Sequence, residues 1–193
     1  MSAIFYFVLL ALVGLERLVE LRISKRNAAW AFSRGGREFG REHFPFMAAL
    51  HTAFLIAAAL EVWLLQRPFV PWVGWPALAG VLLAQGLRYW VIGTLGPMWN
   101  VRVIVIPGAA VVTAGPYRWL RHPNYLAVVL EGICLPLVHG AWITALAFSA
   151  ANAWLLRVRI RCEEQALSAS TDYRQRFLMT SREELQVLAK ERT

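Results

Sequence analysis

Long apolar stretches alternate with short charged segments along most of this chain. A helix that crosses a bilayer needs roughly 20 mainly apolar residues, which is close to the length of these stretches. Five of them are predicted to span a membrane, over residues 1–21, 44–66, 69–92, 123–138 and 140–156. The pattern therefore predicts an all-α integral membrane protein, with about five transmembrane helices in a single domain over residues 1–193.

The last two spans come from one apolar block, residues 123–156, which carries a single formal charge at Glu131. One helix over this block would be about 51 Å long at 1.5 Å per residue, whereas the hydrocarbon core of a bilayer is about 30 Å thick. Two short helices with a turn at Pro136–Gly140 fit the bilayer. We therefore predict a C-terminal helical hairpin.

Lysine and arginine gather in three of the segments outside the predicted spans. Residues 22–43 hold six of them, 94–122 hold three and 157–193 hold eight. With five spans, all three segments lie on one side, and the positive-inside rule makes that side the cytosol. We therefore expect the N-terminus outside and the C-terminus inside, with 94–122 and 157–193 forming one cytosolic face.

Two segments of that face have patterns of their own. Residues 93–113 are rich in β-branched residues, Gly and Pro without a helical period, which predicts a loop or a short hairpin. Residues 168–172 indicate a helix break, followed by a short amphipathic piece to Leu178. Residues 181–184 form a capping box that predicts a last helix.

Composition agrees with a membrane protein and argues against nucleic acid as a partner. The chain is 58% apolar and only 17% charged, with a formal charge of +8; an ordinary soluble domain is about 25% charged. The basic residues stand between apolar blocks rather than in a nucleic-acid-binding pattern. Cys134 and Cys162 lack the spacing of a metal site, so no metal is expected.

The densest set of chemically active residues runs from Gly115 to Tyr125. Pro123 suits the first position of a helix, where its missing N–H costs nothing. Arg121 and His122 then lie at the positive end of that helix, which is suited to binding an anion. The alternative is that Arg121 and His122 are the basic residues that commonly flank a membrane span, and that Tyr125 anchors the helix at the membrane–water interface.

A second polar set follows the fifth predicted span, in Arg157-Val-Arg159-Ile-Arg161-Cys-Glu163-Glu164. Arg159 and Glu163 are four residues apart, so a surface helix with ion pairs is one interpretation. The other is that Glu163 and Glu164, adjacent carboxylates just below the membrane, bind a cationic or hydroxyl-rich ligand.

Glu61 and Glu131 are carboxyl residues that fall well inside the second and fourth predicted spans. A charge inside a membrane is costly, which makes such residues candidates for function. Glu131 either lines the same cavity as Tyr125, six residues earlier, or pairs with Arg88.

These motifs together resemble the isoprenylcysteine carboxyl methyltransferase family over roughly residues 94–177. The resemblance rests on Gly115-Pro-Tyr117, on Arg121-His122-Pro123-x-Tyr125, on Arg159-x-Arg161-x-Glu163-Glu164-x-x-Leu167 and on Tyr173. The double Glu after a helical hairpin also recurs in phospholipid methyltransferases. Residues 16–27 are similar to the short bacterial members, some of which methylate hydroxyls of alkylresorcinols or alkylpyrones.

The resemblance implies a helical membrane fold with a cytosolic S-adenosylmethionine pocket, in a bacterial inner membrane. It implies transfer of a methyl group to oxygen of a lipophilic acceptor that enters from the bilayer. Carried over by position, the residues that contact the cofactor are Tyr117, His122, Pro123, Tyr125, Glu163 and Glu164. The family's proline-containing ending is replaced here by a polar stretch, residues 179–193, which puts any acceptor contact from the tail in doubt.

The acceptor decides which residues would be catalytic. A carboxylate acceptor is already anionic and needs a cation, for which Arg102 and Arg161 are candidates. A phenol or enol must lose a proton, for which His122 and Glu131 are candidate bases. Two other functions stay open: a membrane reductase of the sterol reductase kind, which would use NADPH, and a membrane scaffold without enzymatic activity.

Overall fold

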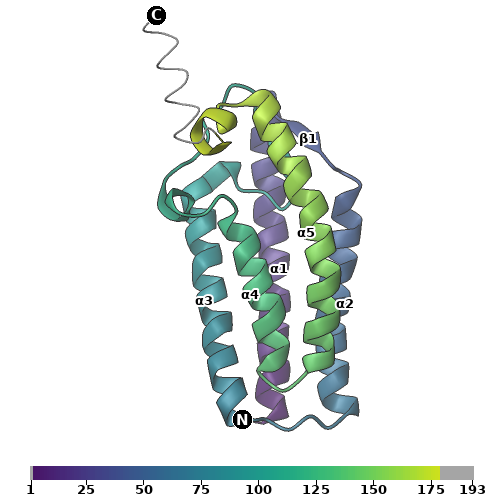
Figure 1. The fold of residues 1–193 in the computed structure, drawn as a ribbon. Coiled ribbons are helices and arrows are strands. Elements are labelled where there is room, and N and C mark those ends of the chain that lie inside the picture. The colour runs from purple at the N-terminus through teal and green to yellow at the C-terminus, as the bar shows by residue number, and fades with distance from the viewer. Residues whose placement is uncertain (1, 179–193) are drawn as a thin grey trace, which may run out of the picture.

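The structure, a computed structural model, describes residues 2–178. Five long helices form an elongated bundle (Figure 1). Their bounds are α1 Ala3–Phe32, α2 His43–Leu64, α3 Pro71–Leu95, α4 Pro123–Leu137 and α5 Trp142–Ser170. Helix α4 packs against both α3 and α5, and α5 also packs against α2. The capping box predicted at 181–184 lies outside the described residues.

Each predicted span coincides with a helix, but two of the helices are longer than their spans. Helices α2, α3 and α4 begin and end within three residues of the predicted limits, whereas α1 continues to Phe32 and α5 to Ser170. Arg, Lys and Glu are good helix formers, so the charged residues that end an apolar stretch do not end the helix. The α5 helix ends within the break predicted at 168–172, and a single π-helical turn follows over Arg174–Leu178.

Within the described residues, two helices are long and apolar enough to cross a membrane, α2 and the stretch Pro71–Met98 that contains α3. Helix α4 is also apolar but shorter. The outer surface of the bundle is covered by large apolar side chains such as Ile4, Trp72 and Leu83, which are exposed by 73%, 89% and 70%. The membrane character of the chain is therefore visible in the fold, and the count of five spans stays a prediction.

The turn between α4 and α5 falls at Pro136–Gly140, as predicted. Gly140 has φ +73°, a backbone conformation that glycine adopts without a steric penalty. The start of α5 is capped by Glu61 of α2, whose carboxylate accepts hydrogen bonds from the backbone N–H groups of Ile143 and Thr144 at 3.2 and 2.7 Å. Glu61 therefore has a structural partner in the hairpin.

A small antiparallel sheet joins two distant segments at the C-terminal end of the bundle (Figure 1). Strand β1, Arg37–Phe39, pairs with β2, Val103–Val105, so that Glu38 lies opposite Ile104. The prediction of a loop or local hairpin over 93–113 is thus wrong in one respect, because the strand within it pairs with a segment that follows α1. Apart from this sheet, residues 2–178 form helices and the loops that connect them.

The extension of α1 beyond the predicted span fixes the connection after α3. Ser24 Oγ donates to Asn100 Oδ1 at 2.7 Å, and Asn27 Nδ2 donates to the carbonyl oxygen of Trp99 at 2.8 Å. Both α1 side chains are buried, where a lost hydrogen bond is costly. The segment that leads into β2 is therefore held in place by α1.

Close packing within the hairpin gives the first prediction. A Cβ atom at Gly132 of α4 would overlap the ring of Phe148 on α5, whereas one at Gly86 of α3 would meet no atom within 4 Å. We expect Gly132→Ala to destabilise the protein by about 1–3 kcal/mol, because a packed core resists added volume. Gly86→Ala is the matched control and should stabilise by up to about 1 kcal/mol through helix propensity. Thermal unfolding in detergent measures both; equal melting temperatures for the two variants would contradict this packing.

Candidate functional site

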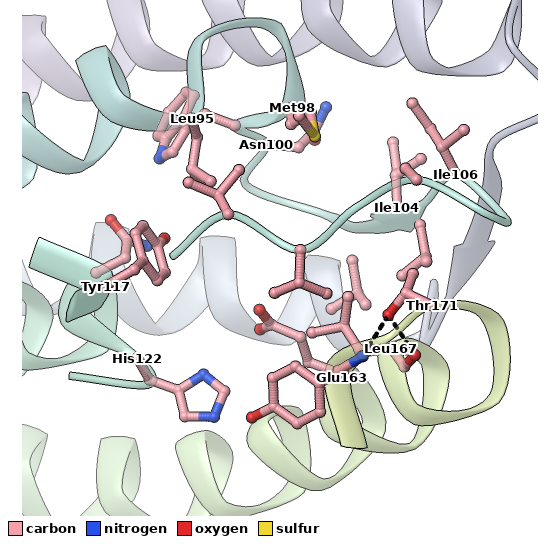
Figure 2. Close-up of a pocket in the computed structure, with 18 of the residues that line it drawn as sticks. Leu95, Met98, Asn100, Ile104, Ile106, Tyr117, His122, Glu163, Leu167 and Thr171 are labelled. Carbon is pink, nitrogen blue, oxygen red and sulfur yellow. Dashed lines mark hydrogen bonds between the residues drawn. The ribbon is translucent and has the colours of Figure 1, made fainter. Parts of the chain in front are cut away.

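A cavity of about 170 Å³ lies at the C-terminal end of the bundle (Figure 2). Its walls come from the end of α3, the strand β2, the 3₁₀ turn Gly115–Arg118, the start of α4 and the end of α5. Five of the predicted catalytic and cofactor-binding residues line it: Arg102, Tyr117, His122, Tyr125 and Glu163. Segments far apart in the chain are thus brought to one site.

His122 and Glu164 are joined by a hydrogen bond between the start of α4 and the end of α5. His122 Nε2 lies 3.0 Å from Glu164 Oε1, and the Tyr173 hydroxyl donates to the same oxygen at 3.2 Å. A carboxylate partner at Nε2 favours the proton on that nitrogen, which leaves Nδ1 as the acceptor of a neutral ring. Glu164 itself does not line the cavity, so it fixes His122 and Tyr173, which do.

A second set of contacts surrounds Tyr125, on the first turn of α4. Its hydroxyl donates to Glu163 Oε2 and accepts from Arg159 Nε at 3.0 Å. Arg159 is 6% exposed and also donates to the carbonyl oxygen of Val101, in the segment before β2. A carboxylate, a phenol and a guanidinium are thereby aligned at the inner end of the cavity.

The segment after β2 covers the cavity and is tied to the end of α5. The backbone N–H of Gly108 donates to the Ser170 carbonyl at 2.8 Å, and the N–H of Val111 donates to Asp172 Oδ1 at 2.9 Å. Hydrogen bonds from the Val111 N–H and from Arg176 lower the pKa of Asp172. The cover is therefore anchored by an ionised carboxylate at neutral pH.

Besides Glu164, three of the predicted site residues do not line the cavity. Arg161 is exposed and does not line it, because its side chain leaves the helix about 200° away from that of Arg159. The geometry therefore gives no support to its predicted role as the cation for the acceptor, and Arg159 is the arginine of this stretch that lines the cavity. Pro123 is fully buried beneath the site as the first residue of α4, so it shapes the turn and does not line the cavity.

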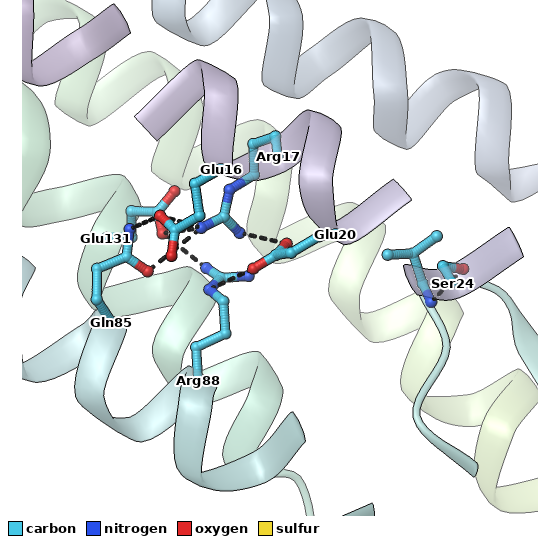
Figure 3. Close-up of polar contacts among 8 residues, drawn as sticks. Glu16, Arg17, Glu20, Ser24, Gln85, Arg88 and Glu131 are labelled. Atoms are coloured by element: carbon cyan, nitrogen blue, oxygen red, sulfur yellow. Dashed lines mark hydrogen bonds and ion pairs between the residues drawn. The ribbon is translucent and has the colours of Figure 1, made fainter. Parts of the chain in front are cut away.

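Glu131 is the third, and the structure selects one of its two interpretations. Arg88 Nη2 donates to Glu131 Oε2 at 2.7 Å, and both side chains are buried (Figure 3). Glu131 lines neither this cavity nor the one described next. Its predicted role as a base for the acceptor has no support in this geometry, since its carboxylate is paired with a guanidinium.

A larger, mainly apolar cavity of about 450 Å³ lies deeper in the bundle. It is lined by α1, α2, α3, α4 and α5, with apolar side chains such as Leu18, Leu55 and Leu155. It shares four lining residues with the first cavity: Trp99, Asn124, Tyr125 and Arg159. Tyr125 and Arg159 therefore stand at the boundary between a polar and an apolar compartment.

Sequence reasoning missed the site roles of Arg159 and Tyr173. One of the two interpretations of its segment places Arg159 in a surface ion pair, whereas it is buried between α4 and the segment before β2. Its spacing from Glu163 was the available signal, because residues four apart share a helix face and Glu163 was expected to face the ligand. Tyr173 follows the helix break, where no periodicity predicts a side-chain direction.

Glu164 gives a prediction for acid pH. Partial burial raises its pKa, but hydrogen bonds from His122 and Tyr173 outweigh this, so the pKa lies below its ordinary 4.5. The stabilisation is present above that ordinary value and is lost as pH falls through the lower pKa of the folded state. We expect the wild-type melting temperature to fall more than that of Glu164→Gln between about pH 5 and about pH 3. Parallel curves for the two proteins would refute this linkage.

Comparison with known proteins provides evidence that does not depend on the geometry of the cavity. A sequence profile of the isoprenylcysteine carboxyl methyltransferase family matches residues 77–169, a range that includes α4 and most of α5. The chain is 37% identical over 163 residues to "Uncharacterized protein YpbQ" of Bacillus subtilis (strain 168), covering 84% of this chain and 96% of that protein. It is 30% identical over 155 residues to an "Uncharacterized protein" of Haemophilus influenzae, covering 79% and 88%. No solved structure matches the chain.

Most of the residues that line the first cavity lie within the range matched by the family profile. The Bacillus subtilis relative aligns with this chain over nearly its whole length. The resemblance found in the motifs is thus confirmed by the profile and by a short bacterial relative. The chain belongs to the isoprenylcysteine carboxyl methyltransferase family.

Proposed function

We propose that this protein is an S-adenosylmethionine-dependent O-methyltransferase that acts on a lipophilic acceptor. The observation that carries the proposal is the meeting of the two cavities at Tyr125 and Arg159. The polar cavity has the chemistry for a charged cofactor and the apolar cavity has the chemistry for a lipid. Family membership supports methyl transfer as the reaction.

The residues around the polar cavity fit the groups of S-adenosylmethionine. The cofactor's carboxylate suits His122 and the positive end of α4. Its ammonium and ribose hydroxyls suit Glu163, one of whose two carboxylate oxygens is engaged by Tyr125. Apolar side chains such as Ile104, Ile106 and Leu167 supply a wall for an adenine ring (Figure 2).

When bound, the cofactor supplies an activated methyl group on sulfur, so the protein's task is placement and exclusion of water. Arg159 stabilises negative charge on the acceptor oxygen, whether a carboxylate or a phenol that has lost its proton. Arg102 lines the same cavity but is paired with Glu38 at 3.0 Å, which partly neutralises it. His122, through Nδ1, is the candidate to accept the proton of a phenol or enol.

We further propose five membrane spans, with the N-terminus outside and the polar cavity on the cytosolic side of a bacterial inner membrane. The outward-facing apolar side chains of α1 and α5, including Ile4, Leu146 and Trp154, support spans beyond the two apolar helices. Charged residues gather where α1 and α5 extend past their apolar parts. The acceptor then enters the apolar cavity from the bilayer.

Calorimetry of the purified protein in detergent tests the cofactor. We expect S-adenosylhomocysteine to bind and NADPH to show no binding; the reverse would support the reductase alternative. A well-folded protein that binds neither would rule out the transferase. A scaffold without activity would bind neither and would lose only stability on His122→Ala.

A further inference from the structure

A groove of about 350 Å³ lies between α1 and α2, at the end of the bundle that carries the small sheet (Figure 1). Its walls come from α1, from β1 and the start of α2, and from the segment before β2. Arg102 lines both this groove and the polar cavity. The groove is otherwise separate from the proposed cofactor site, and the proposed methyl transfer gives it no role.

Positive charge from different segments of the chain meets in this groove. Its lining includes Lys25 of α1, Arg41 before α2, and Arg102, against one carboxylate, Glu38, which gives a formal charge of +2. Arg102 is paired with Glu38 at 3.0 Å, so Lys25 and Arg41 carry the excess. Within residues 2–178, neither of these two forms an ion pair with a carboxylate. Like charges in one groove repel each other, which favours an anion between them.

The other part of the groove is apolar and continues into the apolar cavity. Leu21, Phe44 and Val101 line both spaces. Leu21 is the last residue of the first predicted span and Phe44 is the first residue of the second. The groove therefore changes from basic to apolar at the level where the hydrocarbon of the bilayer is predicted to end. A ligand that fits both parts has an anionic head and an apolar chain.

We propose that this groove binds an anionic phospholipid, with its phosphate between Lys25 and Arg41 and an acyl chain along Leu21 and Phe44. Lysine and arginine are the usual donors to phosphate oxygens, and basic pockets between membrane helices hold lipid headgroups in other proteins. Free phosphate would leave the apolar part of the groove unfilled, so a lipid is favoured over a free anion. This lipid is distinct from the methyl acceptor, and the proposal does not depend on the proposed function.

Native mass spectrometry of the protein in detergent tests the site with two lipids that have the same chains. Dioleoyl phosphatidylglycerol carries a net negative charge, whereas dioleoyl phosphatidylcholine has the same phosphate but no net charge. We expect wild type to retain one phosphatidylglycerol with a Kd about 10- to 30-fold lower than for phosphatidylcholine, because each nearby cation contributes about fivefold to the binding of an anionic lipid.

Lys25→Gln combined with Arg41→Gln should reduce this preference to within about threefold. Arg22→Gln combined with Arg26→Gln is the matched control, since it removes two positive charges from exposed residues of α1 that do not line the groove. It should keep most of the preference, because exposed charges outside the site are screened. No preference in wild type would overturn the proposal. An equal loss in both double variants would also overturn it, because unspecific attraction to a basic surface gives that result.

Thermal unfolding in detergent separates a lipid from a free anion. We expect phosphatidylglycerol to raise the melting temperature of wild type and of the Arg22→Gln/Arg26→Gln control more than that of the Lys25→Gln/Arg41→Gln variant, as a ligand that binds the folded state does. Inorganic phosphate at the same concentration should leave all three proteins unchanged. Equal stabilisation of wild type by phosphate and by the lipid would show a free-anion site and contradict the proposal.

Discussion

Glu163→Ala is expected to weaken the binding of S-adenosylhomocysteine by about 10- to 100-fold, which corresponds to about 1.5–3 kcal/mol for a hydrogen bond to a charged group. Glu163 lines the polar cavity, and its carboxylate is also held by the Tyr125 hydroxyl. Its loss removes the negative charge suited to the ammonium and ribose hydroxyls of the ligand, and it frees Tyr125 from one partner. Isothermal calorimetry in detergent measures the change.

Gln165→Ala is the control for this experiment, since Gln165 is exposed two residues further along α5. It should bind the ligand as wild type does. Glu164→Ala should weaken binding less than Glu163→Ala, because Glu164 acts through His122 and Tyr173 and does not line the cavity. An unchanged affinity in Glu163→Ala would refute its placement at the ligand.

Arg88→Met is expected to destabilise the protein by about 3–5 kcal/mol, the usual result of removing one partner of a buried ion pair. Arg88 lies between Glu20 and Glu131, at 3.6 and 2.7 Å. Without Arg88, the single guanidinium of Arg17 is left to pair with three carboxylates, those of Glu16, Glu20 and Glu131. Two of these, Glu20 and Glu131, are buried. Thermal unfolding in detergent, followed by tryptophan fluorescence, measures the loss.

Removing Glu131 should cost less than removing Arg88, because it leaves two carboxylates and two guanidinium groups in this network of ion pairs. Arg176→Met provides the exposed control, as Arg176 pairs with Asp172 at the surface, and exposed pairs contribute little. A melting temperature of Arg88→Met equal to that of the control would show that the buried network does not stabilise the bundle.

Much of the fold could be predicted because the bilayer imposes a length on apolar stretches. The limits of α2, α3 and α4 and the turn at Pro136–Gly140 follow from that constraint. The extension of α1 to Phe32 could not be predicted in the same way, because charge marks the end of a membrane span and not the end of a helix. The pairing of β1 with β2 depends on α1 holding the connection at Asn100, a contact between distant segments.

The sequence predicted the site residues that belong to dense motifs. It missed residues whose place in the site depends on the direction of the side chain. His122, Tyr125 and Glu163 meet at one cavity, as their motifs predicted. Arg161 and Arg159 are two residues apart with the same side chain, and only the packing of α5 against α4 decides which faces inward. The pair between Glu131 and Arg88 was one of two equal interpretations, since sequence does not give the rotation of α3 against α4.

The central claim is that the cavity bounded by β2, the start of α4 and the end of α5 holds S-adenosylmethionine. A structure of the protein in lipid nanodiscs with saturating S-adenosylhomocysteine tests it most directly. The ligand is predicted beside Glu163 and His122, covered by the segment that Asp172 anchors. Ligand density elsewhere in the bundle, or none at saturating concentration, would contradict this account.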